Sequence, residues 1–110
     1  MKIEKIIKPS EMIKIEIKDE LGHSIGRASL FLIFNDLHDR PYGLMEDVFV
    51  KEEFRGNGYG TQLVREIITI AQEKDCYKLV AQSRHSKPLV HELYKKLGFK
   101  EHGLNFRIDF

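Results

Sequence analysis

The sequence predicts an α+β fold in which a mixed central sheet, an antiparallel meander plus a parallel strand pair, packs with two main helices. In the N-terminal part, apolar residues alternate with charged ones, which is typical of half-exposed strands. Farther on, a strand, a glycine-rich turn and an amphipathic helix lead to another apolar strand, and such a crossover joins parallel strands. The length of 110 residues suits one core, so we expect a single domain over residues 1–110.

Three strands are expected to form the meander. Residues 12–18 alternate apolar and charged side chains, and a turn follows them. Residues 25–34 return as a longer and more apolar strand, in which Gly26 marks a candidate bulge. A loop over 37–43 then leads to the third strand, 44–50.

Two helices and one parallel strand are expected after the meander. Residues 60–74 form the first helix, because apolar residues recur there at helical spacing: Leu63, Val64, Ile67, Ile68 and Ala71. Residues 77–82 form a strand parallel to 44–50. A second helix begins near Ser86 or Lys87, with Pro88 in its first turn, and stops at Gly98. The alternating apolar residues of 99–110 predict one or two closing strands.

The turn between the third strand and the first helix has the outline of an anion site. Glycines at 56, 58 and 60 allow positive φ and let backbone N–H groups converge, and the positive end of the helix dipole points into the turn. We therefore expect a phosphate-bearing ligand. No run matches a nucleotide P-loop, and the glycines run G-x-G-x-G rather than in the dinucleotide pattern G-x-G-x-x-G. A plain linking turn is the alternative.

Composition limits the kinds of partner. Eighteen basic and seventeen acidic residues leave a net charge of +1, so we expect no nucleic acid and no membrane as a partner. Cys76 is the single cysteine, which excludes an internal disulfide, and the five histidines show no metal-ligand spacing. The N-terminal residues lack the apolar core of a signal peptide, so a cytoplasmic protein is expected.

Two motifs resemble those of one family. Arg55, Gly58 and Gly60 match the Q/R-x-x-G-x-G/A motif of the GNAT acetyltransferase superfamily, and residues 93–99 resemble its L/F-Y-x-K-L-G-F signature. Both occur in the family's order and at about its separation, and the resemblance covers about residues 12–110. It implies a GNAT-like acyl-CoA N-acyltransferase fold with an abbreviated N-terminal region. It also implies acetyl-CoA as co-substrate and transfer of the acetyl group to a primary amine of a small molecule or a protein.

The resemblance also implies which residues hold the coenzyme. The diphosphate lies on the backbone of the glycine turn in this family, and the pantetheine arm pairs with the main chain of the third strand. Carried over residue by residue, the coenzyme contacts are Val48, Phe49, Val50, Arg55, Gly56, Asn57, Gly58, Tyr59, Gly60 and Thr61. Lys87 stands where many members carry an asparagine that bonds the pantetheine arm, which puts that contact in doubt.

Acid and base roles follow from the same resemblance. Tyr94 matches the family's general acid for the departing sulfur, although its helical spacing also suits an apolar face. A base is needed because an alkyl amine is protonated at neutral pH. Glu46 and Asp47 are adjacent on the third strand and should point to opposite faces. We choose Glu46, because it should share its face with Val48 and Val50. The structural alternative is that both acids cap a strand end or pair with Arg84 or Arg40.

Several readings stay open at this point. The short N-terminal region leaves either an open acceptor site or one that a second subunit completes, and abbreviated C-terminal strands make a homodimer plausible. Residues 83–86 are expected at the mouth of the cleft, where they either contact the acceptor or the coenzyme or simply form a polar loop. His91 either orients an acceptor or supports its helix. The alternative function is a non-catalytic module that binds coenzyme A or an acyl-coenzyme A as a sensor.

Overall fold

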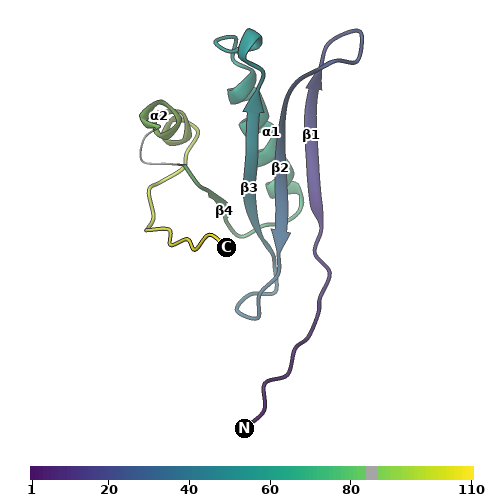
Figure 1. Cartoon of the computed structure of the whole chain (residues 1–110), viewed down its shortest axis with the longest axis vertical. Coiled ribbons are helices and arrows are strands. Elements are labelled where there is room, and N and C mark those ends of the chain that lie inside the picture. Colours follow the sequence, from purple (N-terminus) through teal and green to yellow (C-terminus); the bar gives the residue numbers. More distant parts are fainter. Residues whose placement is uncertain (84–86) are drawn as a thin grey trace.

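The computed structural model describes residues 1–83 and 87–110. Figure 1 shows a twisted sheet with one long helix across it and a shorter helix beyond the β4 edge. The elements are β1 (Met12–Lys18), β2 (Ser24–Ile33), β3 (Tyr42–Val50), a 3-10 turn (Glu52–Phe54), α1 (Tyr59–Glu73), β4 (Leu79–Ala81) and α2 (Pro88–Lys96).

The sheet has the expected mixed topology. Its strand order is β1-β2-β3-β4; β1, β2 and β3 are antiparallel, and β3 pairs in parallel with β4. The register of β1 and β2 shifts beside Gly26, because Ile17 lies opposite Gly26 while Lys18 lies opposite Ser24. Gly26 also has no room for a side chain, since a Cβ there would lie 2.8 Å from the Phe49 carbonyl oxygen. The candidate bulge at Gly26 is therefore confirmed as a register shift.

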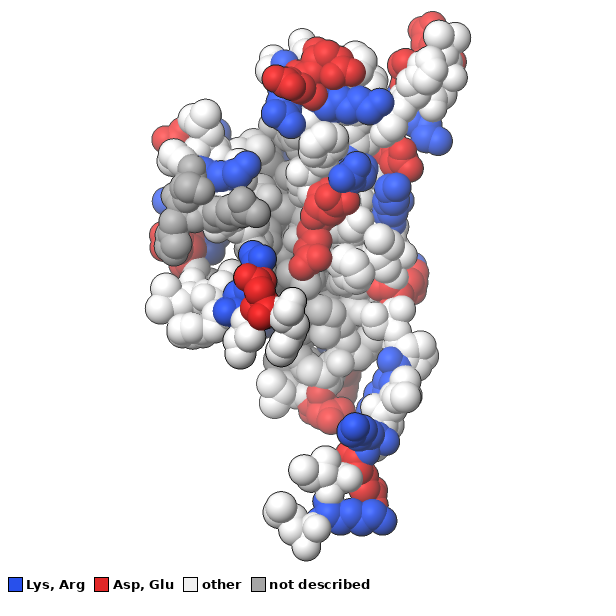
Figure 2. Space-filling model, in the orientation of Figure 1, with Lys and Arg blue, Asp and Glu red and all other residues white. Residues whose placement is uncertain are grey.

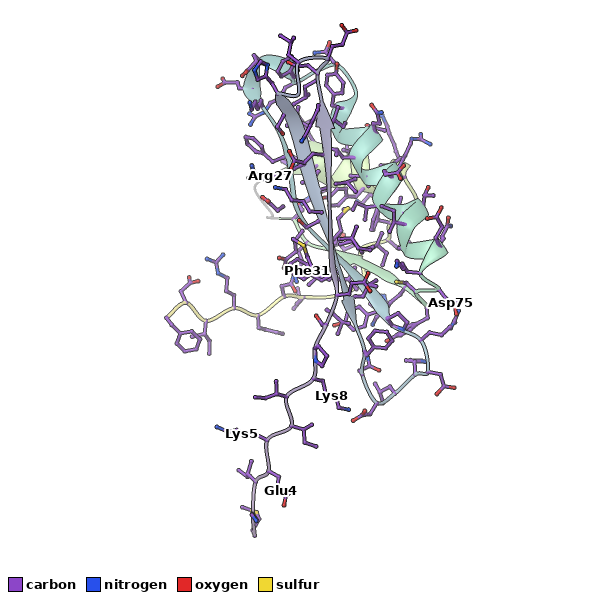
Figure 3. The ribbon with its side chains drawn as sticks, turned by 90° about the vertical axis from the view of Figure 1, so that its right-hand side faces the viewer. Glu4, Lys5, Lys8, Arg27, Phe31 and Asp75 are labelled. Carbon is purple, nitrogen blue, oxygen red and sulfur yellow. The ribbon has the colours of Figure 1, made fainter. Side chains whose placement is uncertain are left out.

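The core lies between α1 and one face of the sheet. In β1 and β2, alternate side chains turn toward α1, and the others, Arg27 and Phe31 among them, lie on the face away from it (Figure 3). We call this second side the outer face. The buried cluster on the α1 side consists of Ala28, Leu30, Leu32, Met45, Leu63, Val64, Ile67 and Ala71.

An extra residue in β3 changes which of its side chains face the core. Ser29 lies opposite Glu46, and Arg27 lies opposite Phe49, so two steps along β2 match three along β3. Asp47 takes φ = +54° at this bulge. Met45 before the bulge is buried, and Val48 and Val50 after it also pack against the core cluster.

The expectation that Glu46 shares a face with Val48 and Val50 is therefore wrong. Glu46 follows the core residue Met45 and lies on the outer face, whereas the two valines have been turned to the α1 side. Side chains alternate between the two faces of the strand on each side of the bulge, but the alternation is interrupted at the bulge itself.

The second helix begins and ends as expected. Lys87 is its N-cap and Pro88 its first residue, where a missing N–H costs nothing. At the other end Gly98 takes φ = +102°, and the Phe99 N–H donates to the Tyr94 carbonyl at 3.0 Å. This left-handed closing turn is available to glycine at little cost.

The prediction of closing strands over 99–110 is wrong. No strand is assigned there, and the apolar side chains of this segment are 77–116% exposed: Leu104, Phe106, Ile108 and Phe110. We call residues 100–110 the C-terminal arm. A strand needs a partner, and β4, the nearest edge of the sheet, is only three residues long rather than the six expected. The loop expected over 37–43 is also shorter, because β3 begins at Tyr42.

Candidate functional site

The glycine turn between β3 and α1 is open to a ligand. Gly56 and Gly58 take φ values of +83° and +82°, and a Cβ built on either would have no atom within 4 Å. Gly60 lies in the first turn of α1 with ordinary helical backbone. The left-handed region expected of the turn is thus used by two of its three glycines.

The first turn of α1 leaves backbone donors for an anion. The helix N-cap is Gly58, so no side chain caps the helix, and the first turn carries no acidic residue. The N–H groups at the start of a helix have no intrahelical acceptor, and the first N–H bonded to the capping residue is that of Gln62. Those of Tyr59, Gly60 and Thr61 are therefore available beside the positive end of the dipole.

Two side chains brace the turn through hydrogen bonds to backbone carbonyl oxygens. Arg55 Nε donates to the Val50 carbonyl oxygen at 2.9 Å, which ties the turn to the end of β3. Asn57 Nδ2 donates to the Phe54 carbonyl oxygen at 2.9 Å and closes the 3-10 turn. Arg55 is exposed, and its Nη atoms have no hydrogen-bond partner among the described residues. Arg55 can therefore brace the turn and still present two nitrogens to an anion.

Strands β3 and β4 part beside this turn. Their parallel ladder joins Gly43 to Leu79 and ends where Met45 faces Ala81, whereas β3 continues to Val50. Within the described residues, the main chain of 46–50 has no strand on its β4 side. We call this stretch the open edge of β3. Unpaired N–H and C=O groups on such an edge can pair with an extended ligand.

The two carboxylates of β3 have different surroundings. Asp47 accepts two hydrogen bonds from Arg27, with Nε–Oδ2 at 2.7 Å and Nη2–Oδ1 at 3.2 Å. The hydrogen bond from Arg27 holds the pKa of Asp47 below its ordinary value, and a carboxylate with a lowered pKa is a weaker base. Glu46 is exposed and forms no ion pair or hydrogen bond within the described part of the chain. Of the two, Glu46 is the carboxylate that has no partner among the described residues.

Tyr94 projects from α2 against the core cluster. Its ring lies 5.3 Å from that of Phe99, centroid to centroid, and the side chain is half-buried. Burial raises the pKa of the Tyr94 phenol above its ordinary value, so the phenol keeps its proton at neutral pH. Packing and proton donation are therefore compatible at this residue.

Arg27 was missed by the sequence reasoning. Asp47 pairs with Arg27, while Arg40 pairs with Asp75 at 3.2 Å, so the expected alternative pairing with Arg40 is wrong. A usable signal was present, because Arg27 is the sole charged residue in the apolar strand Ser24–Ile33. Residues 84–86, which include the other expected partner Arg84, lie outside the described residues.

Three further observations concern the surface and other kinds of site. Acidic and basic side chains are interspersed on the face shown in Figure 2. The described residues hold no group of three His, Cys, Asp or Glu side chains placed to bind a metal. Among the helices of residues 1–83 and 87–110, none is long and apolar enough to cross a membrane.

Comparison with known sequences gives several acetyltransferases. Glucosamine 6-phosphate N-acetyltransferase of Trypanosoma brucei brucei is 34% identical over 98 residues, which make up 87% of this chain and 64% of that protein. Thialysine N-epsilon-acetyltransferase of Bos taurus is 32% identical over 57 residues, 52% of this chain and 34% of that protein. The chain thus spans less than two thirds of these relatives' lengths.

Comparison with solved structures agrees. A crystal structure of a Trypanosoma brucei acetyltransferase covers 90% of this chain with a TM-score of 0.81 and 30% identity, over 69% of its own length. The fold of the glucosamine-6-phosphate N-acetyltransferase from Arabidopsis thaliana is also shared, with a TM-score of 0.80 at 22% identity, over 90% of this chain and 67% of that one. The family model described as "Acetyltransferase (GNAT) family" matches residues 3–99. This chain, with its glycine turn beside the open edge of β3, belongs to the GNAT acetyltransferase family.

Proposed function

We propose that this protein is an acetyl-CoA-dependent N-acetyltransferase, with residues 1–110 as its single domain. The observation that carries the proposal is that two sets of unpaired backbone groups lie close together in the chain. The start of α1 offers free N–H groups to a diphosphate, and the open edge of β3 offers a strand-like partner to the pantetheine arm. These two features lie at the two ends of the short segment 51–58.

Acetyl-CoA fits this arrangement in charge and in shape. The diphosphate needs several donors and little steric bulk, and the glycine turn provides both. The Thr61 hydroxyl and the Nη atoms of Arg55 add side-chain donors at the same place. The bound thioester supplies the acetyl group.

The reaction has a simple balance. The ammonium form of the amine first gives up one proton, after which the neutral nitrogen forms a bond with the acetyl carbon and the carbon–sulfur bond breaks. The nitrogen then loses a further proton to solvent, and the sulfur takes up one. Glu46 accepts the first proton, directly or through water, and its lack of a partner supports this role. Tyr94 donates the proton that the sulfur takes up, and its phenol carries this proton at neutral pH.

The acceptor is a primary amine of a small molecule or of a protein. Relatives are named for a sugar phosphate and for an amino acid, glucosamine 6-phosphate and thialysine. Another is named a putative N-acetyltransferase of the alanine of ribosomal protein bS18, with 28% identity over 83 residues. These names define the panel of acceptors to test.

Mass spectrometry of products tests the function. The purified protein is mixed with acetyl-CoA and a panel of amino sugars, amino acids, polyamines and N-terminal peptides, while release of free thiol is followed. We expect a mass gain of one acetyl group on a single amine class, with thiol release that depends on that acceptor. Binding of acetyl-CoA without transfer to any acceptor would instead favour the sensor reading, and no binding would refute the coenzyme site.

Glu46→Gln tests the base. We expect turnover to fall by about 10²-fold or more and the acidic limb of the pH–rate profile to change, because the amide cannot accept the proton. Asp47→Asn is not an equivalent control, since Asp47 is bonded to Arg27. Glu52→Gln, on the 3-10 turn, is the matched control and should leave the profile unchanged. A wild-type profile in Glu46→Gln would remove Glu46 from the mechanism.

We also propose that the protein forms a homodimer. The C-terminal arm exposes four alternating apolar side chains and β4 is an edge strand, and surfaces of this kind are usually covered. Analytical ultracentrifugation should show a dimer, and Phe106→Ser with Ile108→Ser should weaken it. A monomer at all concentrations would refute the proposal.

A further inference from the structure

The bulge in β3 holds an unfavourable backbone conformation next to the open edge. Asp47 carries a Cβ and yet takes φ = +54°, a region that side chains adopt rarely, although aspartate and asparagine enter it more readily than the others. Such a conformation persists only where surrounding contacts impose it, and its presence at a functional site points to a role. The contacts that impose it here can be identified.

Arg27 holds Asp47 from the neighbouring strand. The guanidinium makes two hydrogen bonds to the carboxylate, at 2.7 Å and 3.2 Å, in the planar arrangement that fixes both groups. Both side chains are partly open to solvent, with 41% of Arg27 and 55% of Asp47 exposed. Ion pairs as exposed as this one contribute little to global stability.

The same guanidinium connects the bulge to the glycine turn. Arg27 Cζ lies 4.7 Å from the centroid of the Phe49 ring, and Arg55 Cζ lies 5.7 Å from it. Arg55 in turn donates to the Val50 carbonyl oxygen. Cation–π contacts and hydrogen bonds thus form a continuous series from Asp47 through Arg27, Phe49 and Arg55 to the end of β3.

We propose that Arg27 is a positioning residue for acetyl transfer, which fixes the bulge at Asp47 and the main chain of the open edge where the pantetheine arm binds. This inference rests on the function proposed above. Arg27 lies on β2 and acts through Asp47 and Phe49, so it needs no contact with either substrate. The open edge pairs with β2 on one side only, so its main-chain geometry depends on the contacts that fix the bulge.

A second arginine–aspartate pair provides the matched control. Arg40 Nη1 lies 3.2 Å from Asp75 Oδ1, both side chains are exposed, and Asp75 also takes a positive φ, +59°. Asp75 lies beyond the end of α1 that is remote from the glycine turn (Figure 3). Both arginines thus pair with an aspartate of positive φ, but Arg40 makes a single hydrogen bond, lies in a loop and is remote from the open edge.

Kinetics of Arg27→Gln and Arg40→Gln form the first test. We expect Arg27→Gln to lower kcat about 10-fold or more with little change in KM for acetyl-CoA, because displacement of a bound reactant slows the chemistry. Arg27→Lys, which keeps the charge but loses the paired hydrogen bonds, should restore only part of kcat. Arg40→Gln should keep wild-type kcat, and urea midpoints should agree among all three variants. Wild-type kcat in Arg27→Gln would overturn the inference.

Amide hydrogen exchange of the free protein forms the second test and needs no activity. We expect faster exchange at residues 48–50 in Arg27→Gln than in the wild type, and no change there in Arg40→Gln. Unchanged exchange at these amides would overturn the positioning role. If the wild type transfers no acetyl group while exchange still rises in Arg27→Gln, the function fails and the restraint of the bulge stands.

Discussion

The two helices of this protein differ in how firmly the fold holds them. α1 buries Leu63, Val64, Ile67 and Ala71 against the sheet, whereas α2 buries no residue completely and is followed by an exposed arm. The phosphate-binding end of the proposed site therefore belongs to the well-packed helix α1, and the proposed acid Tyr94 belongs to the lightly packed helix α2. The difference suggests that the diphosphate site is preformed and that the acid has more freedom to adjust.

Truncation of one leucine in each helix should show the largest contrast. Leu63→Ala, at a side chain that is 1% exposed, should lower the free energy of unfolding by about 2–5 kcal/mol. Leu89→Ala, at a side chain of α2 that is 80% exposed, should change it by less than about 0.5 kcal/mol. Urea denaturation followed by circular dichroism measures both. Equal losses would mean that α2 is anchored as firmly as α1.

Tyr94→Phe should affect turnover and leave binding in place. Removing the phenol oxygen should reduce kcat by about 10²-fold or more, because the sulfur then lacks its proton donor. The KM for acetyl-CoA should stay near its wild-type value. Tyr77→Phe, which removes a phenol bonded to Asn35, is the control for loss of a hydroxyl far from the site. An unchanged kcat in Tyr94→Phe would leave this residue with packing alone.

Glycine substitutions compare the backbone of the glycine turn with the backbone of the C-terminal arm. Gly58→Ala forces a Cβ into φ = +82°, which should cost about 1–2 kcal/mol and also weaken acetyl-CoA binding. Gly103→Ala in the C-terminal arm, where φ is not in the left-handed region and space is open, should be nearly neutral. Thermal unfolding and calorimetric titration measure the two effects. A neutral Gly58→Ala would show that the turn can adapt.

The smallest expected effect is a pH dependence of stability at the bulge. The hydrogen bond from Arg27 lowers the pKa of Asp47 in the folded protein, so its stabilising contribution is present above the ordinary aspartate pKa of about 3.9. That contribution is lost as the pH falls through the lower pKa of the folded state. A surface pair contributes about 0–1 kcal/mol, so the stability difference between wild type and Asp47→Asn should shrink slightly from pH 5 to pH 2.5. Urea denaturation across this range measures it, and a constant difference would contradict the assignment.

Sequence reasoning succeeded where local pattern decides structure. The alternation of residues 12–18 predicted β1 with its observed bounds, and the spacing of apolar residues predicted α1 to within one residue at each end. Gly98 was correctly identified as the stop of α2. Each of these signals depends on neighbours along the chain, which a sequence displays directly.

The bulge and the C-terminal arm escaped the same reasoning because they depend on partners distant in sequence. Asp47 takes its conformation in a contact with Arg27, twenty positions away. A hint was available, because the core residues Met45, Val48 and Val50 are spaced by three and then by two. The arm has the pattern of a strand but finds no edge long enough among the described strands to pair with.

The bulge also determines which side chains of β3 face the core. Side chains alternate between the two faces up to Met45 and again from Val48 onward. The single extra residue between them lets Met45, Val48 and Val50 all face the same core. Deletion of Asp47 would place Val48 two residues after Met45, so Val48 and Val50 would still face the core and only the bulge would be lost, whereas deletion of Phe49 would turn Val50 to the outer face. A deletion scan along residues 44–50, read out as soluble yield, should therefore find deletion of Asp47 better tolerated than deletion of Phe49, because only the second changes which side chains face the core.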